Sequence, residues 1–136
     1  MRTADLYVEV QRFYAHQMPL LEARRIPEFV DTFTADGSYE QVKDGWRLEG
    51  RDVLLQVLTA NAPVYGTSVI RHWFDQMRLE PLDAGSVRVT YRALVSVTAE
   101  TGAVTFEPST TVTDVLVRQD GGLRTKSRSV RPDTRV

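Results

Sequence analysis

The sequence predicts one α+β domain, residues 1–136, in which a curved antiparallel sheet wraps three N-terminal helices and leaves a pocket between the two layers. Two patterns support this fold class. Apolar residues recur every three or four positions in the first part of the chain, and the second half carries long segments rich in Val, Thr and aromatic residues. A chain of 136 residues also suits a single domain that buries its own core.

The first helix is expected from Asp5 to Ala23, because apolar residues spaced by three and four make one broad stripe there. Thr3 can cap its start. Pro19 removes one helical hydrogen bond, so we expect a kink or an early end at this position. A second helix is predicted from Pro27 to about Phe33, where proline suits the first turn.

Short strands are expected at 38–42 and 46–49, joined as a small hairpin. A third helix is expected to begin at Gly50-Arg51-Asp52 and to end before Pro63. The helix before the hairpin is expected to stop at Ala35-Asp36-Gly37.

The second half predicts four long strands joined by tight turns, which together form an antiparallel meander. The expected strands are Val69–Leu79, Ser86–Ala99, Val104–Val117 and Leu123–Arg131. A sheet of such length must twist, so its concave face can wrap the helices. The basic tail from Arg124 to Arg135 predicts an edge strand with alternating charge rather than an anion-binding patch.

Composition excludes several classes of protein. Seventeen Lys and Arg residues against eighteen Asp and Glu residues argue against a nucleic-acid partner. The absence of cysteine excludes disulfides, thiolate metal sites and a cysteine nucleophile, and it fits a reducing compartment. Apolar runs are short and the N-terminus is charged, so we expect a cytoplasmic protein with no membrane segment.

The sequence offers acid-base chemistry and little else. Its two histidines, His16 and His72, are far apart and make a poor metal site. Motifs for a dinucleotide, a phosphate loop or a nucleophilic serine are missing as well. We therefore expect neither a metal nor a cofactor.

Three residues are candidates for catalysis. His72 lies in a strand of which one parity faces the cavity, and a neutral imidazole can move a proton to and from an acidic carbon. Its neighbours of opposite parity, Arg71, Trp73 and Asp75, are expected on the outer surface. Tyr14, on the apolar stripe of the first helix, could donate a hydrogen bond to an enolate oxygen. Asp36 could assist His72.

Each candidate also has a structural explanation. His72 could be bonded to a neighbouring strand, Tyr14 could be a packing residue and Asp36 could close a turn. Asp75 and Asp114 suit acid-base work if buried without a partner, and are otherwise exposed or paired with arginines close in sequence. A wall for a flat substrate is expected from four strand aromatics, of which half could belong to the core or an interface: Tyr39, Trp46, Tyr91 and Phe106.

The order of elements resembles the cone fold of the nuclear transport factor 2-like superfamily, and within it the SnoaL-like polyketide cyclase group. Four strings carry the resemblance: Val10-Gln-Arg-Phe-Tyr14, Phe33-Thr-Ala-Asp-Gly-Ser-Tyr39, Gly50-Arg-Asp and Ile70-Arg-His-Trp73. The resemblance implies a deep apolar pocket and a homodimer formed through the outer sheet face. Isomerases of the superfamily use a carboxylate near the end of the first strand as base. That position falls on Gln41 here, while Glu40 points to the other face.

The expected function is that of a cofactor-independent cyclase, dehydratase or isomerase acting on an apolar carbonyl-bearing metabolite of polyketide or related secondary metabolism. His72 would act as base or acid, Tyr14 would polarise the carbonyl and Asp36 would assist. The alternative is a non-catalytic module of the same fold that binds a hydrophobic ligand or serves in a dimeric assembly. A further option is a subunit that accompanies a larger oxygenase.

Overall fold

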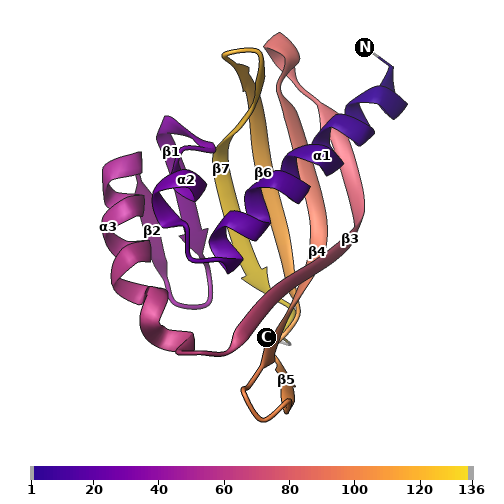
Figure 1. The fold of residues 1–136 in the computed structure, drawn as a ribbon. Helices are drawn as coiled ribbons and strands as arrows, with labels where there is room; N and C mark the ends of the chain where they lie inside the picture. The colour runs from indigo at the N-terminus through magenta and orange to yellow at the C-terminus, as the bar shows by residue number, and fades with distance from the viewer. Residues whose placement is uncertain (1, 135–136) are drawn as a thin grey trace.

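A computed structural model describes residues 2–134 as three helices laid against a curved, open sheet of seven strands (Figure 1). The helices are α1 (Thr3–Glu22), α2 (Ile26–Val30) and α3 (Arg51–Asn61), with short 3-10 turns at Ala62–Tyr65 and Asp83–Gly85. The strands are β1 (Phe33–Gln41), β2 (Trp46–Glu49), β3 (Val69–Pro81), β4 (Val87–Thr98), β5 (Val104–Phe106), β6 (Thr110–Gln119) and β7 (Gly122–Pro132). The predicted α+β cone with an interior space is confirmed.

The strands follow the order β2-β1-β7-β6-β4-β3, and β5 pairs with β4. All pairs are antiparallel except β1 with β7, which is parallel, so the sheet is mixed rather than wholly antiparallel. The predicted strand at 104–117 is two strands, because residues 107–109 interrupt it; of these, Glu107 still donates its amide to the Val95 carbonyl of β4 at 3.0 Å.

The basic tail does not form an edge strand, and that prediction was wrong. Strand β7 lies between β1 and β6, with both of its backbone edges hydrogen-bonded. Val42 also donates its amide to the Val130 carbonyl at 3.0 Å. A basic residue of this strand, Arg128, is inside the protein because its side chain lies on the face that meets α1, where it contacts Gln17 and Met18. Arg135, the last residue of the predicted tail, lies outside the described residues.

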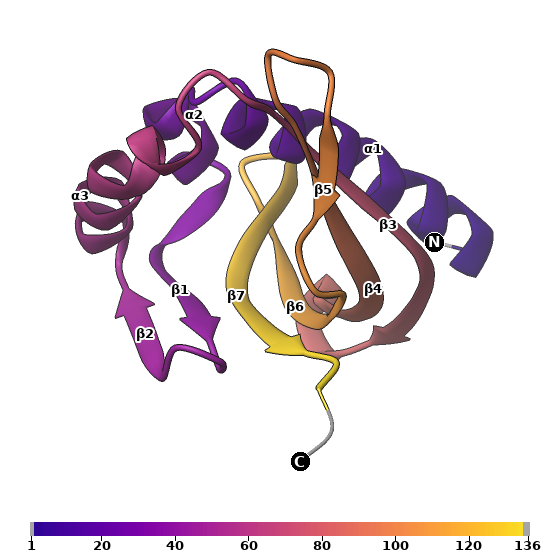
Figure 2. The same ribbon diagram turned by 90° about the horizontal axis from the view of Figure 1, so that it is seen from below.

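Helix α1 crosses the concave face of the sheet, whose curvature is visible from below (Figures 1 and 2). Thr3 is its first residue and not its cap; Arg2 holds the cap position without a side-chain hydrogen bond. The helix continues past Pro19 to Glu22, and the Ala23 amide donates to the Pro19 carbonyl at 2.9 Å. Proline costs the helix its own N–H donor but does not end it here.

Helix α2 is shorter than predicted and β1 begins earlier. Phe33 is paired with Thr125 of β7, and the Thr125 amide donates to the Thr32 carbonyl at 2.9 Å. These bonds take the chain into the sheet before Ala35-Asp36-Gly37. No helix of the described residues is long and apolar enough to cross a membrane.

Two β-bulges change which residues face inward. In β3 an extra residue lies between Asp75 and Arg78, where Gln76 has a φ of 58°. In β7 the register with β6 shifts between Thr125 and Ser127, which leaves Lys126 as the extra residue. Inward positions therefore change parity along each strand: Thr125 and Arg128 are both buried, although three residues apart.

Candidate functional site

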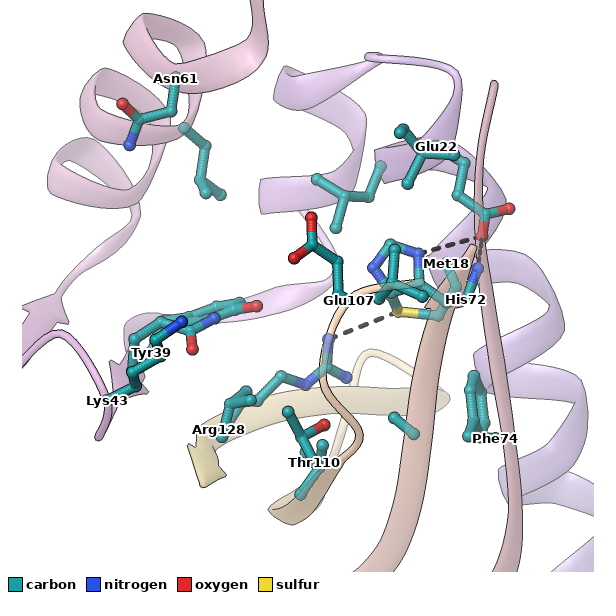
Figure 3. A pocket seen from close by; sticks show the side chains of 18 of the residues that line it. Met18, Glu22, Tyr39, Lys43, Asn61, His72, Phe74, Glu107, Thr110 and Arg128 are labelled. Carbon is teal, nitrogen blue, oxygen red and sulfur yellow. Dashed lines mark hydrogen bonds and ion pairs between the residues drawn. The ribbon is translucent and has the colours of Figure 1, made fainter. Parts of the chain in front are cut away.

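A cavity of about 400 Å³ opens between the concave face of the sheet and the helices (Figure 3). Its apolar walls come mainly from α1, β3, β4 and β6, and include Met18, Ile70, Phe74 and Val112. Polar side chains also line it: Glu22, His72 and Arg128 are buried or partly buried, and others such as Arg24, Lys43 and Asp44 are exposed. A concave space with apolar walls and convergent polar groups is typical of a small-molecule site.

His72 lies in the wall of the cavity and is bonded to Glu22. Its Nδ1 is 3.0 Å from Glu22 Oε2, and its backbone amide donates to the same oxygen. The contact places the proton of the neutral ring on Nδ1. The opposite ring nitrogen, Nε2, is turned toward the interior (Figure 3). Burial would raise the pKa of Glu22, but its hydrogen bonds with His72 outweigh this and hold the pKa below its usual value.

The second polar group is a buried ion pair between Arg128 and Asp114. Arg128 Nε donates to Asp114 Oδ1 and Nη2 donates to Oδ2, both at 3.0 Å. Asp114 is fully buried and Arg128 is 3% exposed. Burial would lower the pKa of Arg128, but Asp114 raises it well above its usual value, so the guanidinium stays charged.

Tyr14 is brought to this ion pair rather than to the cavity. Its hydroxyl donates to Asp114 Oδ2 at 2.6 Å, and the Tyr91 hydroxyl donates to the same oxygen at 3.1 Å. Burial raises the pKa of both hydroxyls well above the usual value, which keeps them protonated. Tyr91 lines the cavity with its ring, whereas Tyr14 is not part of the lining.

Asp36 lies away from the site. It is exposed, and its Oδ1 accepts a hydrogen bond from the Thr34 hydroxyl at 2.8 Å, which holds its pKa below the usual value. Asp36 lies within β1, at the register shift between Phe33 and Ser38, and closes no turn there. His16 is exposed on α1 and lines a separate shallow hollow.

Three of the four predicted aromatics lie where a wall was expected. Tyr39 and Trp46 line the cavity with their rings stacked, 5.8 Å between centroids, and Tyr91 faces them from β4. Phe106 does not; it belongs to β5 and is 61% exposed. On β3, Arg71, Trp73 and Asp75 point outward as predicted.

The neighbouring positions on β1 also have the predicted parity. Gln41 lines the cavity, while Glu40 accepts a hydrogen bond from the Ser129 hydroxyl at 2.9 Å. At the mouth, Tyr65 donates to Glu107 Oε1 at 3.2 Å. Among residues 2–134, no group of three or more His, Asp and Glu side chains is close enough together to hold a metal ion.

Sequence reasoning missed Glu22 and Arg128. Glu22 follows Pro19, where an early helix end was expected, so the residue was not placed beside the sheet. Arg128 was assigned to an exposed edge. Asp114 was expected either without a partner or paired with an arginine close in sequence, and its partner Arg128 comes from the neighbouring strand instead. Alternating polarity in β7 could have indicated a buried arginine only if the bulge at Lys126 were known.

Comparison with protein families matches residues 2–129 to the SnoaL-like domain. A comparison with curated proteins finds no match. Among solved structures, Aln2 from a Streptomyces species is 38% identical with a TM-score of 0.90, over 98% of this chain and 94% of that chain. ActVI-ORFA from Streptomyces coelicolor is 35% identical with a TM-score of 0.89, over 98% of each chain. A Catenulispora acidiphila protein in complex with S-DNPA is 36% identical with a TM-score of 0.85, over 96% of each chain.

Proposed function

This chain belongs to the SnoaL-like family, and from that membership we propose that it is a cofactor-independent enzyme for an apolar, carbonyl-bearing metabolite of the polyketide type. The reaction begins with removal of a proton from the carbon next to the carbonyl. Cyclisation, dehydration and isomerisation share this step, so the same active site can serve any of the three reactions.

The observation that carries the proposal is the His72–Glu22 pair in the cavity wall. His72 Nε2 takes the α-proton: the C–H bond breaks, an N–H bond forms, and the electron pair moves onto the carbonyl oxygen as an enolate. Glu22 accepts the hydrogen bond from Nδ1, holds the ring in orientation and stabilises the imidazolium. The imidazolium then returns its proton to a carbon or to a departing hydroxyl.

The cavity suits such a substrate. A volume of about 400 Å³ falls in the range of small-molecule sites. The Tyr39 and Trp46 rings give a flat wall against which a planar ring system can lie. The similar Catenulispora acidiphila protein was solved in complex with S-DNPA, which supports a ligand-binding role for this chain.

The exposed outer face of the sheet favours a second proposal about assembly. Trp73 is 60% exposed there, and Val104 and Phe106 of β5 are 51% and 61% exposed. A second copy of the chain would cover these side chains, because contiguous apolar surface is costly in water. We propose a homodimer through this face.

The catalytic proposal is tested with 2-tetralone, a bicyclic aromatic ketone, by following deuterium uptake at its α-carbons in D₂O by NMR. The wild-type protein should accelerate the exchange, and His72→Gln should slow it by about a hundred-fold or more. His16→Gln is the matched control and should leave the rate unchanged, since His16 is exposed outside the cavity. If the wild type binds the ketone yet exchange is no faster than in buffer, the binding-module alternative replaces the enzyme.

A further inference from the structure

One N–H group of Arg128 at the cavity wall is available to bind a substrate. A guanidinium has five N–H groups. Three of them are used by Asp114 and Gln17: Nε and Nη2 bond the carboxylate, and Nη2 also donates to Gln17 Oε1 at 2.6 Å. Nη1 makes one hydrogen bond, to the Met18 thioether sulfur at 3.5 Å. Within residues 2–134, its second N–H meets no acceptor.

This donor is held rigidly. Gln17, which orients Nη2, is itself fixed by hydrogen bonds from its Nε2 to Thr32 and Thr125 at 2.8 and 2.9 Å. Asp114, which orients the other edge, is held by Tyr14 and Tyr91. A donor fixed before the reaction stabilises developing charge without reorganisation.

Tyr14 and Tyr91 cannot supply that donor. Each has one O–H, and both are given to Asp114 Oδ2. Arg128 faces the cavity where Tyr14 does not, and Met18 lies between Arg128 and His72 in the lining (Figure 3). A thioether is a weak acceptor, so a substrate oxygen can replace it at Nη1.

The charges of the interior indicate which oxygen this is. The charge of Arg128 is balanced by Asp114, and Glu22 adds one negative charge beside His72. A substrate carboxylate would bring further negative charge beside Arg128 and Glu22, while the other two cations of the lining, Arg24 and Lys43, are at exposed positions. A neutral carbonyl enters without that cost, and its negative charge appears only as His72 becomes positive.

We propose that Arg128 Nη1 binds the carbonyl oxygen of the substrate and stabilises the oxyanion that forms as the α-proton leaves. The assignment rests on the proposed enolisation and names its oxyanion donor. It gives Arg128 the role that the sequence suggested for Tyr14, and it makes Asp114, Tyr14 and Gln17 positioning residues.

The test uses substituted 2-naphthols of graded acidity as enolate analogues, with the ionised form measured by its ultraviolet absorbance. The wild type should bind the naphtholate about ten- to a hundred-fold more tightly than the neutral naphthol, as expected for a hydrogen bond from a charged donor. His72→Ala should keep this preference, which excludes the imidazole as its source. The double variant Arg128→Gln with Asp114→Asn, which removes both buried charges, should lose it.

A preference for the neutral naphthol in the wild type overturns the assignment, and so does a folded double variant that still prefers the naphtholate. If the double variant does not fold, the guanidinium nitrogen resonances of Arg128 in the wild type decide, because they must shift when naphtholate saturates the site. Tighter binding of 2-naphthoate than of naphtholate would reassign Arg128 to carboxylate recognition. Naphtholate preference without deuterium exchange of 2-tetralone would contradict the proposed enzyme while leaving the anion site standing.

Discussion

Glu22, the last residue of α1, accepts hydrogen bonds from both the ring and the backbone amide of His72 on the edge strand β3, fifty positions further along the chain. The same carboxylate oxygen thereby orients the imidazole relative to the backbone of β3. It also joins the end of α1 to this strand. The orientation of the catalytic candidate and the closure of the cavity depend on the same contact.

Replacing Glu22 with Gln should reduce the deuterium exchange rate of 2-tetralone by about ten-fold or more, because an amide stabilises the imidazolium less well than a carboxylate does. Ketone affinity should change little. An unchanged rate in a folded variant would remove Glu22 from the mechanism.

The same variant gives a pH dependence of stability. The pKa of Glu22 is lower in the folded protein than its usual value, so its ionised form favours folding. This contribution is present above the unfolded pKa of about 4.3 and is lost as the pH falls through the lower folded pKa. The wild type should therefore exceed Glu22→Gln in unfolding free energy at pH 6, and the difference should shrink toward pH 3 in urea titrations. A difference that grows with acidity would contradict the sign.

Tyr14→Phe should lower the free energy of unfolding by about 1–2 kcal/mol, because Asp114 loses one of its donors in a buried site. Exchange of 2-tetralone should fall only a few-fold, since Arg128 and Tyr91 still hold the carboxylate. Chemical denaturation and the NMR assay measure the two effects. A folded Tyr14→Phe protein with no exchange activity would restore Tyr14 as the oxyanion donor.

Asp114→Asn should destabilise the protein by about 3–5 kcal/mol, because it leaves the buried Arg128 charge without its counterion. Glu9→Gln is the matched control. It weakens a partly exposed ion pair with Arg118, 2.7 Å long, for which about 0–1 kcal/mol is expected. Equal losses in urea unfolding would mean that burial does not control the value of these pairs.

Trp73→Glu should convert a dimer into a monomer if the outer sheet face joins two copies. Sedimentation equilibrium measures the mass, and Val8→Glu is the control, because Val8 is 48% exposed on α1 away from that face. A wild-type protein that is monomeric at micromolar concentration contradicts the proposed dimer directly.

The fold was predictable where local pattern decides it. Turn residues and period-2 alternation located β3, β4 and β7 to within two residues at each end, and the alternation in β3 placed His72 inward. Strand pairing between distant parts of the chain was not predictable. Nothing in the local sequence of 122–132 distinguishes an edge strand from a strand that lies between β1 and β6. The parallel β1–β7 ladder follows from the tertiary fold alone.

The site was predictable only in part. A helical stripe shows that Tyr14 is buried, but it does not show whether its hydroxyl meets a cavity or a carboxylate one hundred positions away. Arg128 was hidden by the bulge at Lys126, which reverses strand parity. Asp36 lies within β1 with an exposed side chain, because the chain enters the sheet before the helix end that was expected at Ala35-Asp36-Gly37.

The placement of β7 between β1 and β6 has a kinetic consequence. Strands β3 to β7 can assemble through hairpins between near neighbours, but β1 must meet β7 by closing a loop from Ser38 to Ser127. Contacts of such long range form late and slowly. Arg128 belongs to this β1–β7 pairing, which forms last. A refolding chain should therefore regain most of its sheet before it regains a ligand-binding cavity.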